Sequence, residues 1–234
     1  MITTVLFDLD GTLLPMDNDV FTKGYFKFLV KKLSPHGYDP QQLVDGIWAG
    51  TAAMVKNDGA CTNEEVFWKK FSSVFGDMCL EDKPVFDEFY KCEFKLARDF
   101  CGFNPKAREA VNTAKARGLR TALATNPIFP AVATEIRIGW AGLDVSDFEL
   151  YTTYENSRFC KPSLSYYREI LQKLSCGAEE CLMVGNDADE DMIATELGMQ
   201  VFLLTDCLIN KSSKDLADCP QGGFDELIKF IKNI

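Results

Sequence analysis

The sequence predicts an α/β protein: a doubly wound, Rossmann-like parallel sheet core into which an all-helical cap domain is inserted. Four short apolar runs bounded by turn residues are typical of buried parallel strands. Helical patterns separate most of these runs, as they do in alternating α/β folds. About ninety residues without a convincing strand separate the first two runs, and this stretch predicts the insertion.

The expected strands end where polar side chains begin. The strands are Thr3–Phe7, Leu119–Ala124, Cys181–Val184 and Val201–Leu204. A helix over Pro105–Arg117 precedes the second strand, and a helix over Leu164–Leu174 precedes the third. In doubly wound folds the ligand site lies beyond the carboxyl ends of the strands, and Asp8, Thr125 and Gly185 fall at that edge.

The insertion carries four amphipathic helical patterns, with apolar residues three and four positions apart. They cover Val20–Leu33, Pro40–Val55, Glu64–Phe75 and Pro84–Phe100, with turns at Gly37, Asn57-Asp58-Gly59 and Gly76-Asp77 between them. A helical insertion after the first strand would lie over the site edge of the sheet. We therefore predict a catalytic core from residues 1–15 and 105–234, and a helical cap domain from residues 16–104.

The composition is that of a soluble folded protein. The 234 residues are 47% hydrophobic and 26% charged, and the formal net charge is −10. An acidic chain without a Lys/Arg cluster repels nucleic acid, so no nucleic-acid partner is expected. No apolar run approaches the roughly 18–20 residues of a membrane span, and no basic segment followed by an apolar stretch opens the chain. We expect a cytoplasmic protein without membrane contact, and its oligomeric state stays open.

Cysteine and histidine chemistry is disfavoured. The nine cysteines are odd in number and include no CxxC pair, which indicates reduced thiols rather than a disulfide framework or a zinc site. The single histidine, His36, lies in a Ser-Pro-His-Gly stretch typical of a surface loop. A Ser-His or Cys-His nucleophile is therefore not expected.

Two carboxylates at the end of the first strand are the first candidate site residues. Asp8 and Asp10 are two positions apart in an extended chain, so their side chains point the same way. Crowded carboxylates repel each other unless a cation or a shared proton lies between them, and Mg²⁺ would satisfy this pair. The alternative is a helix cap or a turn, because Gly11 follows Asp10 directly.

Two further polar signals lie downstream. Thr125 and Asn126 close the second strand, where a hydroxyl and a backbone N–H can bind an oxyanion or cap the following helix. Lys161, fixed by the following proline in an irregular stretch, can hold its ammonium group against carboxylates and a phosphoryl group. Taken alone, it would instead be a solvated surface lysine.

An acidic stretch after the third strand is the fourth signal. Asn186, Asp187 and Asp191 carry oxygen ligands that suit Mg²⁺. For Asp189 and Glu190 we expect a structural role, as acidic residues at a helix N-terminus.

Taken in order, these four signals resemble the motifs of the haloacid dehalogenase-like hydrolase superfamily, and the position of the insertion resembles its C1-capped branch. The resemblance implies that Asp8 is the nucleophile and forms an aspartyl-phosphate, with Asp10 as general acid and base. It also implies that Thr125 and the backbone amide of Asn126 hold a phosphoryl oxygen, while Lys161 neutralises the nucleophile and the developing charge.

The metal ligands that the resemblance implies include one departure from the family pattern. Mg²⁺ would bind through Asp8, the main-chain carbonyl of Asp10 and a side chain of the acidic motif. The family usually has an aspartate directly after the motif glycine, whereas this chain has Asn186 and then Asp187, so both are candidate ligands. Asp191 would act directly or through water.

The expected function is that of a Mg²⁺-dependent phosphatase acting on a small phosphorylated metabolite. Dehalogenases and phosphonatases of this family lack the second aspartate, so Asp10 favours phosphate-ester chemistry. A sugar-phosphate mutase with the same motifs is the alternative. A non-enzymatic phospho-acceptor module is disfavoured, because such domains are shorter and lack the insertion. Lys23, Tyr25, Trp48 and Lys56 of the insertion could reach the pocket, although aromatic residues at helical spacing are more often packed in a core.

Overall fold

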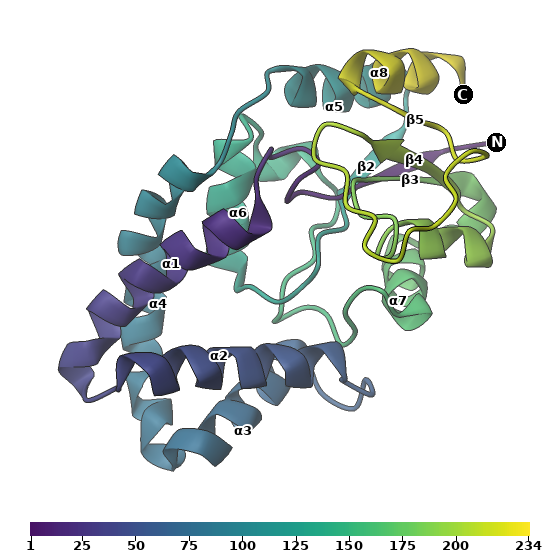
Figure 1. Cartoon of the computed structure of the whole chain (residues 1–234). Helices are drawn as coiled ribbons and strands as arrows, with labels where there is room; N and C mark the ends of the chain where they lie inside the picture. The colour runs from purple at the N-terminus through teal and green to yellow at the C-terminus, as the bar shows by residue number, and fades with distance from the viewer.

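The computed structural model describes residues 1–234 and has a parallel five-stranded sheet (Figure 1). The strands are β1 Thr4–Phe7, β2 Arg120–Leu123, β3 Cys181–Gly185, β4 Gln200–Leu204 and β5 Gln221–Gly222. Their order is β2-β1-β3-β4-β5, and all neighbours are parallel. The predicted α/β fold with a doubly wound parallel sheet is confirmed.

The four predicted strands are all present, and the sheet has one more. Every residue of β1 and β3 is buried, as expected for central strands covered on both faces. Because β1 lies between β2 and β3, Asp8 leaves the sheet from an interior strand and not from an edge. The strand β5 was not predicted, since its two residues, Gln221 and Gly222, carry no apolar pattern.

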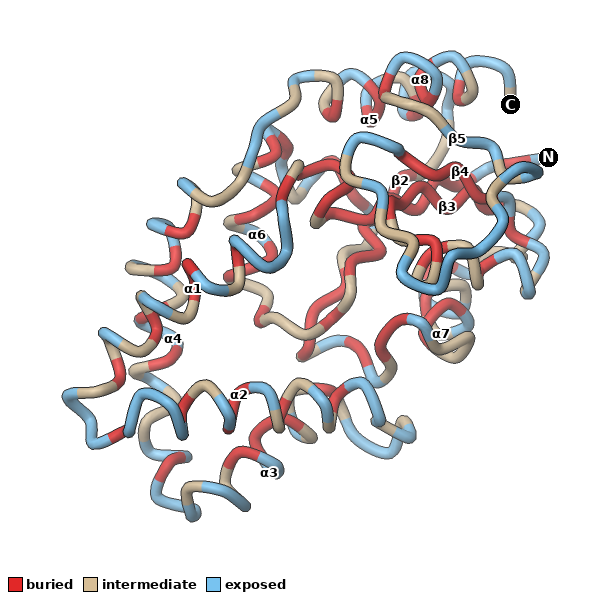
Figure 2. Tube along the Cα trace, in the orientation of Figure 1, coloured by how far each residue is buried: buried red, intermediate tan, exposed pale blue.

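Helices cover both faces of the sheet (Figure 1). On one face, α5 (Lys106–Ala116) and α8 (Phe224–Asn233) pack in the same hydrophobic cluster as Val5 and Val184. On the other face, α7 (Leu164–Leu174) and the 3₁₀ helix η6 (Met192–Leu197) pack with Leu6 and Met183. The strands are the most deeply buried part of the chain (Figure 2). A further helix, α6 (Ala131–Trp140), follows β2.

All the regular elements between β1 and β2 are helices. We call residues 18–100, which end before α5, the helical segment. Its α-helices are α1 Asn18–Leu33, α2 Pro40–Val55, α3 Asn63–Phe75 and α4 Lys83–Lys91, and its 3₁₀ helices are η1 Ser34–His36, η2 Asp77–Asp82 and η3 Glu93–Phe100. Side-chain caps begin the first three α-helices, at Asp17, Asp39 and Thr62. None of the protein's helices has the combination of length and apolar character that crossing a membrane requires.

The predicted single helix Pro84–Phe100 is wrong in its second half. The α-helix stops at Lys91, and Cys92, with a ψ of −78°, separates it from η3. In a 3₁₀ helix, residues three positions apart share one face. Phe94 and Ala97 are buried on that face, and the Phe94 ring stacks on Trp140 with ring centroids 5.4 Å apart. The three-residue spacing of the buried side chains therefore suits 3₁₀ turns better than a continued α-helix.

Asn63, at the start of α3, joins the helical segment to the loop after β2 and to the loop before α7. Its side chain is fully buried, and its Nδ2 donates to the carbonyl of Pro127 at 3.2 Å and approaches Sγ of Cys160 at 3.3 Å. Its backbone N–H donates to the carbonyl of Ser157 at 2.8 Å. One side chain therefore ties the helical segment to two loops of the core.

Replacing Asn63 with alanine should lower the free energy of unfolding by about 1–3 kcal/mol, because buried acceptors then lose their donor. Urea denaturation followed by circular dichroism measures this loss. The control is Ser73→Ala on the exposed side of the same helix. Equal unfolding midpoints for the two variants would contradict the link.

Candidate active site

One cleft contains every residue that the sequence predicts for the site. Its walls include Asp8, Asp10, Thr125, Asn126, Lys161, Asn186, Asp187 and Asp191. These side chains come from the carboxyl ends of β1, β2 and β3 and from the loop before α7. Because neighbouring parallel strands end at the same edge, segments far apart in the sequence meet here.

The ammonium group of Lys161 lies at the base of this cleft. The side chain is only 1% exposed, and its Nζ donates to Oδ1 of Asp8 at 3.0 Å and to Oδ1 of Asp191 at 2.7 Å. Burial alone would lower the pKa of Lys161, but the Asp191 and Asp8 carboxylates hold it well above its usual value. Lys161 is therefore a fixed positive charge, and the alternative of a solvated surface lysine is wrong.

Asp8 is held from both sides. While Oδ1 accepts from Lys161, Oδ2 accepts from the hydroxyl of Thr12 at 2.9 Å. Burial raises the pKa of Asp8 to about 7, and the nearby positive charge of Lys161 opposes this rise. Both oxygens are thus oriented before any ligand arrives, and the carboxyl group titrates near neutral pH.

Asp191 is the second carboxylate that pairs with Lys161. Its Oδ2 accepts the backbone N–H of Asp187 at 2.9 Å, and its side chain is 1% exposed. Gly185 makes this approach possible, because a Cβ at that position would collide with the Asp191 carboxylate. The glycine at the end of β3 is therefore a requirement of packing in the site.

Asn186 and Asp187 differ in what their oxygens face. Oδ1 of Asn186 lies 3.0 Å from the Thr12 hydroxyl, next to Asp8, while its Nδ2 donates to the carbonyl of Cys207 at 2.7 Å. Oδ1 of Asp187 instead accepts two backbone N–H groups of the following turn, at 2.8 and 3.0 Å. The amide oxygen of Asn186 is therefore the one beside the Asp8 carboxylate.

The donor set suits a hard cation that keeps most of its water ligands. No three His, Cys, Asp or Glu side chains are grouped as they are in a ready-made metal cluster. One carboxylate, Asp8, and one amide oxygen, Asn186, share a wall of the cleft, and Lys161 separates Asp8 from Asp191. Mg²⁺ commonly binds through one or two carboxylates and keeps several waters, so this small oxygen set fits it.

Arg137 is a residue of the site that the sequence motifs did not reveal. It lies on α6, is completely buried, and forms an ion pair with Oδ2 of Asp10. Its guanidinium lies 4.4 Å from the centre of the Phe129 ring. Oδ1 of Asp10 is buried and has no hydrogen-bond partner. The one available signal was an arginine beside the apolar residues Ala133 and Ile138 of the same helix.

The strand end at Thr125 is fixed through its backbone. The Thr125 carbonyl accepts from the hydroxyls of Thr152 at 2.6 Å and Tyr166 at 2.8 Å. The Asn126 side chain donates to the Glu190 carboxylate at 3.2 Å. Glu190 lines the cleft and also lies in the turn before η6, near the helix N-terminus where we expected it. Lys211, also unpredicted, adds a cation to the cleft wall.

Replacing Asp8 with asparagine should stabilise the metal-free protein at pH 8. Because the pKa of Asp8 is raised, the folded protein holds this proton more tightly than the unfolded chain does. The carboxyl group therefore contributes its full stabilisation below pH 3.8, its pKa in the unfolded chain, and that contribution is lost as the pH rises through about 7. In buffer with EDTA, the melting temperature of Asp8→Asn should exceed that of wild type by several degrees at pH 8. The gap should narrow towards pH 5.

The exposed Asp218→Asn variant controls for the loss of one negative charge. A melting temperature of Asp8→Asn below that of wild type at pH 8 would contradict this account of Asp8.

Comparison with known proteins identifies a family. Residues 2–196 match the model of the haloacid dehalogenase-like hydrolases. The glyceraldehyde 3-phosphate phosphatase of Methanothermobacter thermautotrophicus is 26% identical over 211 residues, which cover 87% of this chain and 86% of that protein.

Two solved structures share the fold over the full chain. A 2-haloacid dehalogenase from Pseudomonas syringae pv. Tomato is 18% identical with a TM-score of 0.61, covering 100% of this chain and 99% of that one. A putative β-phosphoglucomutase from Thermotoga maritima is also 18% identical, with a TM-score of 0.60 and 100% of both chains covered. At this identity the likeness concerns the fold alone. The family model covers most of the chain, and the protein therefore belongs to the haloacid dehalogenase-like hydrolases.

Proposed function

We propose that this hydrolase is a Mg²⁺-dependent phosphatase that cleaves a phosphomonoester through an aspartyl-phosphate on Asp8. The observation that carries the proposal is the buried Lys161 ammonium, 3.0 Å from Asp8 Oδ1, at the base of a cleft that Thr125 and Asp10 also line. The phosphatase name of the curated relative supports a phosphate-ester substrate.

In the first step, a carboxylate oxygen of Asp8 attacks phosphorus while the bond from phosphorus to the ester oxygen breaks. Lys161 neutralises the nucleophile and the phosphoryl oxygens, since its charge is fixed at that position. The hydroxyl of Thr125 and the backbone N–H of Asn126 donate to a phosphoryl oxygen. Water then attacks the aspartyl-phosphate, which releases inorganic phosphate and restores Asp8.

Asp10 moves the protons of both steps. It protonates the leaving alkoxide and then accepts the proton of the attacking water. The ion pair with Arg137 holds Oδ2 and so orients the Asp10 carboxylate, which lines the cleft. Arg137 acts as a positioning residue, because it touches Asp10 and not the reacting atoms.

Asp8, the main-chain carbonyl of Asp10 and the amide oxygen of Asn186 would hold Mg²⁺. The ion would supply positive charge to the phosphoryl group during transfer. Asn186 is preferred to Asp187, because an oxygen of Asp187 is already committed to two backbone N–H groups. Asp191 contributes by orienting Lys161 or through water.

We further propose that residues 16–104 form the cap domain and that residues 1–15 and 105–234 form the catalytic core. Cleft residues Asn18, Phe21, Thr22 and Trp48 come from the helical segment, which supports a cap over the site.

The proposed chemistry predicts release of inorganic phosphate from phosphomonoesters with Mg²⁺ and none with EDTA. Asp8→Asn should abolish turnover, because the nucleophile is lost, and Asp10→Asn should lower kcat by about 10²–10⁴-fold, because the acid and base is lost. A phosphate-release assay with p-nitrophenyl phosphate and a panel of phosphorylated metabolites measures both.

Asp189→Asn is the matched control for these variants, because Asp189 belongs to the acidic stretch but not to the cleft wall. It should retain wild-type turnover. Full activity of Asp8→Asn, or activity that persists in EDTA, would refute the mechanism.

Arg137→Gln should lower kcat by roughly 10–100-fold with little change in KM, because a supporting partner of a catalytic side chain is lost. Arg137→Lys keeps the charge and should recover part of kcat. Steady-state kinetics on variants with verified folded spectra measures the split. An effect confined to KM, or no rescue by lysine, would argue against positioning of Asp10.

A further inference from the structure

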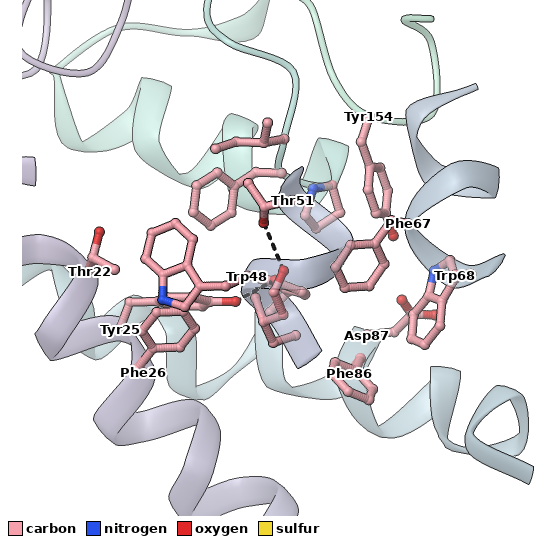
Figure 3. A pocket seen from close by; sticks show the side chains of 15 residues that line it. Thr22, Tyr25, Phe26, Trp48, Thr51, Phe67, Trp68, Phe86, Asp87 and Tyr154 are labelled. Atoms are coloured by element: carbon pink, nitrogen blue, oxygen red, sulfur yellow. Dashed lines mark hydrogen bonds between the residues drawn. The ribbon is translucent and has the colours of Figure 1, made fainter. Parts of the chain in front are cut away.

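A second pocket adjoins the catalytic cleft, and none of the predicted motifs lines it. Four residues line both spaces, namely Thr22, Trp48, Ile128 and Phe129. The second pocket lies between helices of the helical segment and the loop that follows β2, and Figure 3 shows its side chains. Trp48, which is 51% exposed, stands where the two spaces meet. The two spaces therefore adjoin each other across these side chains, and a molecule whose phosphate lies at Lys161 would place its leaving group next to this pocket.

The second pocket is predominantly aromatic. Eleven of its fifteen lining residues are hydrophobic. The Tyr25 ring lies 5.6 Å from the Phe129 ring, and Phe67 lies 6.5 Å from Tyr154, measured between ring centroids. The helical segment supplies Tyr25, Trp48 and Phe67, while Phe129 and Tyr154 come from the core. The pocket therefore exists only where these two parts of the chain meet.

Several of the polar groups in the pocket are already paired. The Tyr25 hydroxyl lies 2.9 Å from that of Tyr90, and the Thr51 hydroxyl donates to the Ile47 carbonyl at 3.0 Å (Figure 3). No lysine or arginine lines the pocket, and the one acidic residue, Asp87, is exposed. A second phosphate or a carboxylate would find no counter-ion here. A sugar would give up its hydrogen bonds to water with few replacements, which is unfavourable.

We propose that this pocket binds the leaving group of the substrate, and that this group is an apolar alcohol with an alkyl chain or an aromatic ring. The inference rests on the proposed phosphatase function and adds the substrate class. It sets this chain apart from the small polar substrate in the name of its curated relative. Apolar area buried against the aromatic side chains supplies the binding free energy, and the Lys161 end of the cleft fixes the phosphate.

A series of n-alkyl phosphates tests the proposal, because ethyl, butyl and hexyl phosphate differ in apolar length but have leaving groups of similar reactivity. The ratio kcat/KM should rise roughly two- to fourfold for each added methylene until the pocket is filled. Glycerol phosphate should be a poorer substrate than butyl phosphate. A flat series, or a preference for glycerol phosphate or glyceraldehyde 3-phosphate, would overturn the substrate class.

Variants locate the effect in the pocket. Trp48→Ala removes a shared wall, and Thr51→Phe fills space inside the pocket. Both positions are at least partly exposed, so the fold should tolerate them. Each variant should reduce the ratio of kcat/KM for hexyl over ethyl phosphate at least severalfold. Val55→Ala, on the same helix but outside both spaces, should keep the wild-type ratio. A ratio unchanged in both pocket variants would overturn the location.

Binding of n-alkylphosphonates, which cannot be hydrolysed, separates this inference from the proposed function. Calorimetry with Mg²⁺ present should show affinity rising with chain length. If affinity rises but no phosphate ester is hydrolysed, the proposed function fails and the apolar pocket stands. If esters are hydrolysed without any dependence on length, the pocket inference fails and the phosphatase stands. Failure of both measurements overturns both.

Discussion

The arrangement of the site depends on the ion pairs that the Lys161 ammonium group makes with two carboxylates. Asp8 and Asp191 follow two neighbouring strands and converge in a space almost closed to solvent. Two buried carboxylates without a counter-ion would be strongly unfavourable, and one buried cation between them makes their approach possible. The same contact connects the loop before α7 to the centre of the sheet, so charge balance and architecture depend on one side chain.

Much of the fold follows from local sequence patterns. The helices α2 and α7 have the predicted bounds, because an apolar stripe and a capping residue mark each of them. The four longer strands were predicted because buried parallel strands are continuous apolar runs. The two-residue β5 and the break at Cys92 carry no such signal. Both arise from tertiary packing, which local patterns do not encode.

Most of the site was predictable because it lies at strand ends. Asp8 and Asn186 come directly after strands and Thr125 follows two residues after β2, whereas Arg137 meets Asp10 from a helix 127 positions later in the chain. The direction in which a side chain points was also not predictable from the sequence. Tyr25 and Trp48 line a pocket, but Lys23 and Lys56, proposed on the same grounds, are exposed and line neither space. Helical periodicity identifies a buried face but not which part of that face borders a cavity.

The contacts of Asn186 link the site to a loop far along the chain. Its Nδ2 donates to the Cys207 carbonyl, and the missing Cβ of Gly11 leaves room for the same amide group. An aspartate at this position would set a carboxylate oxygen against that carbonyl oxygen, and the two would repel. Position 186 and the loop around Cys207 are therefore energetically coupled. An acidic side chain at 186 requires that loop to move, so substitutions at the two places are expected to be non-additive.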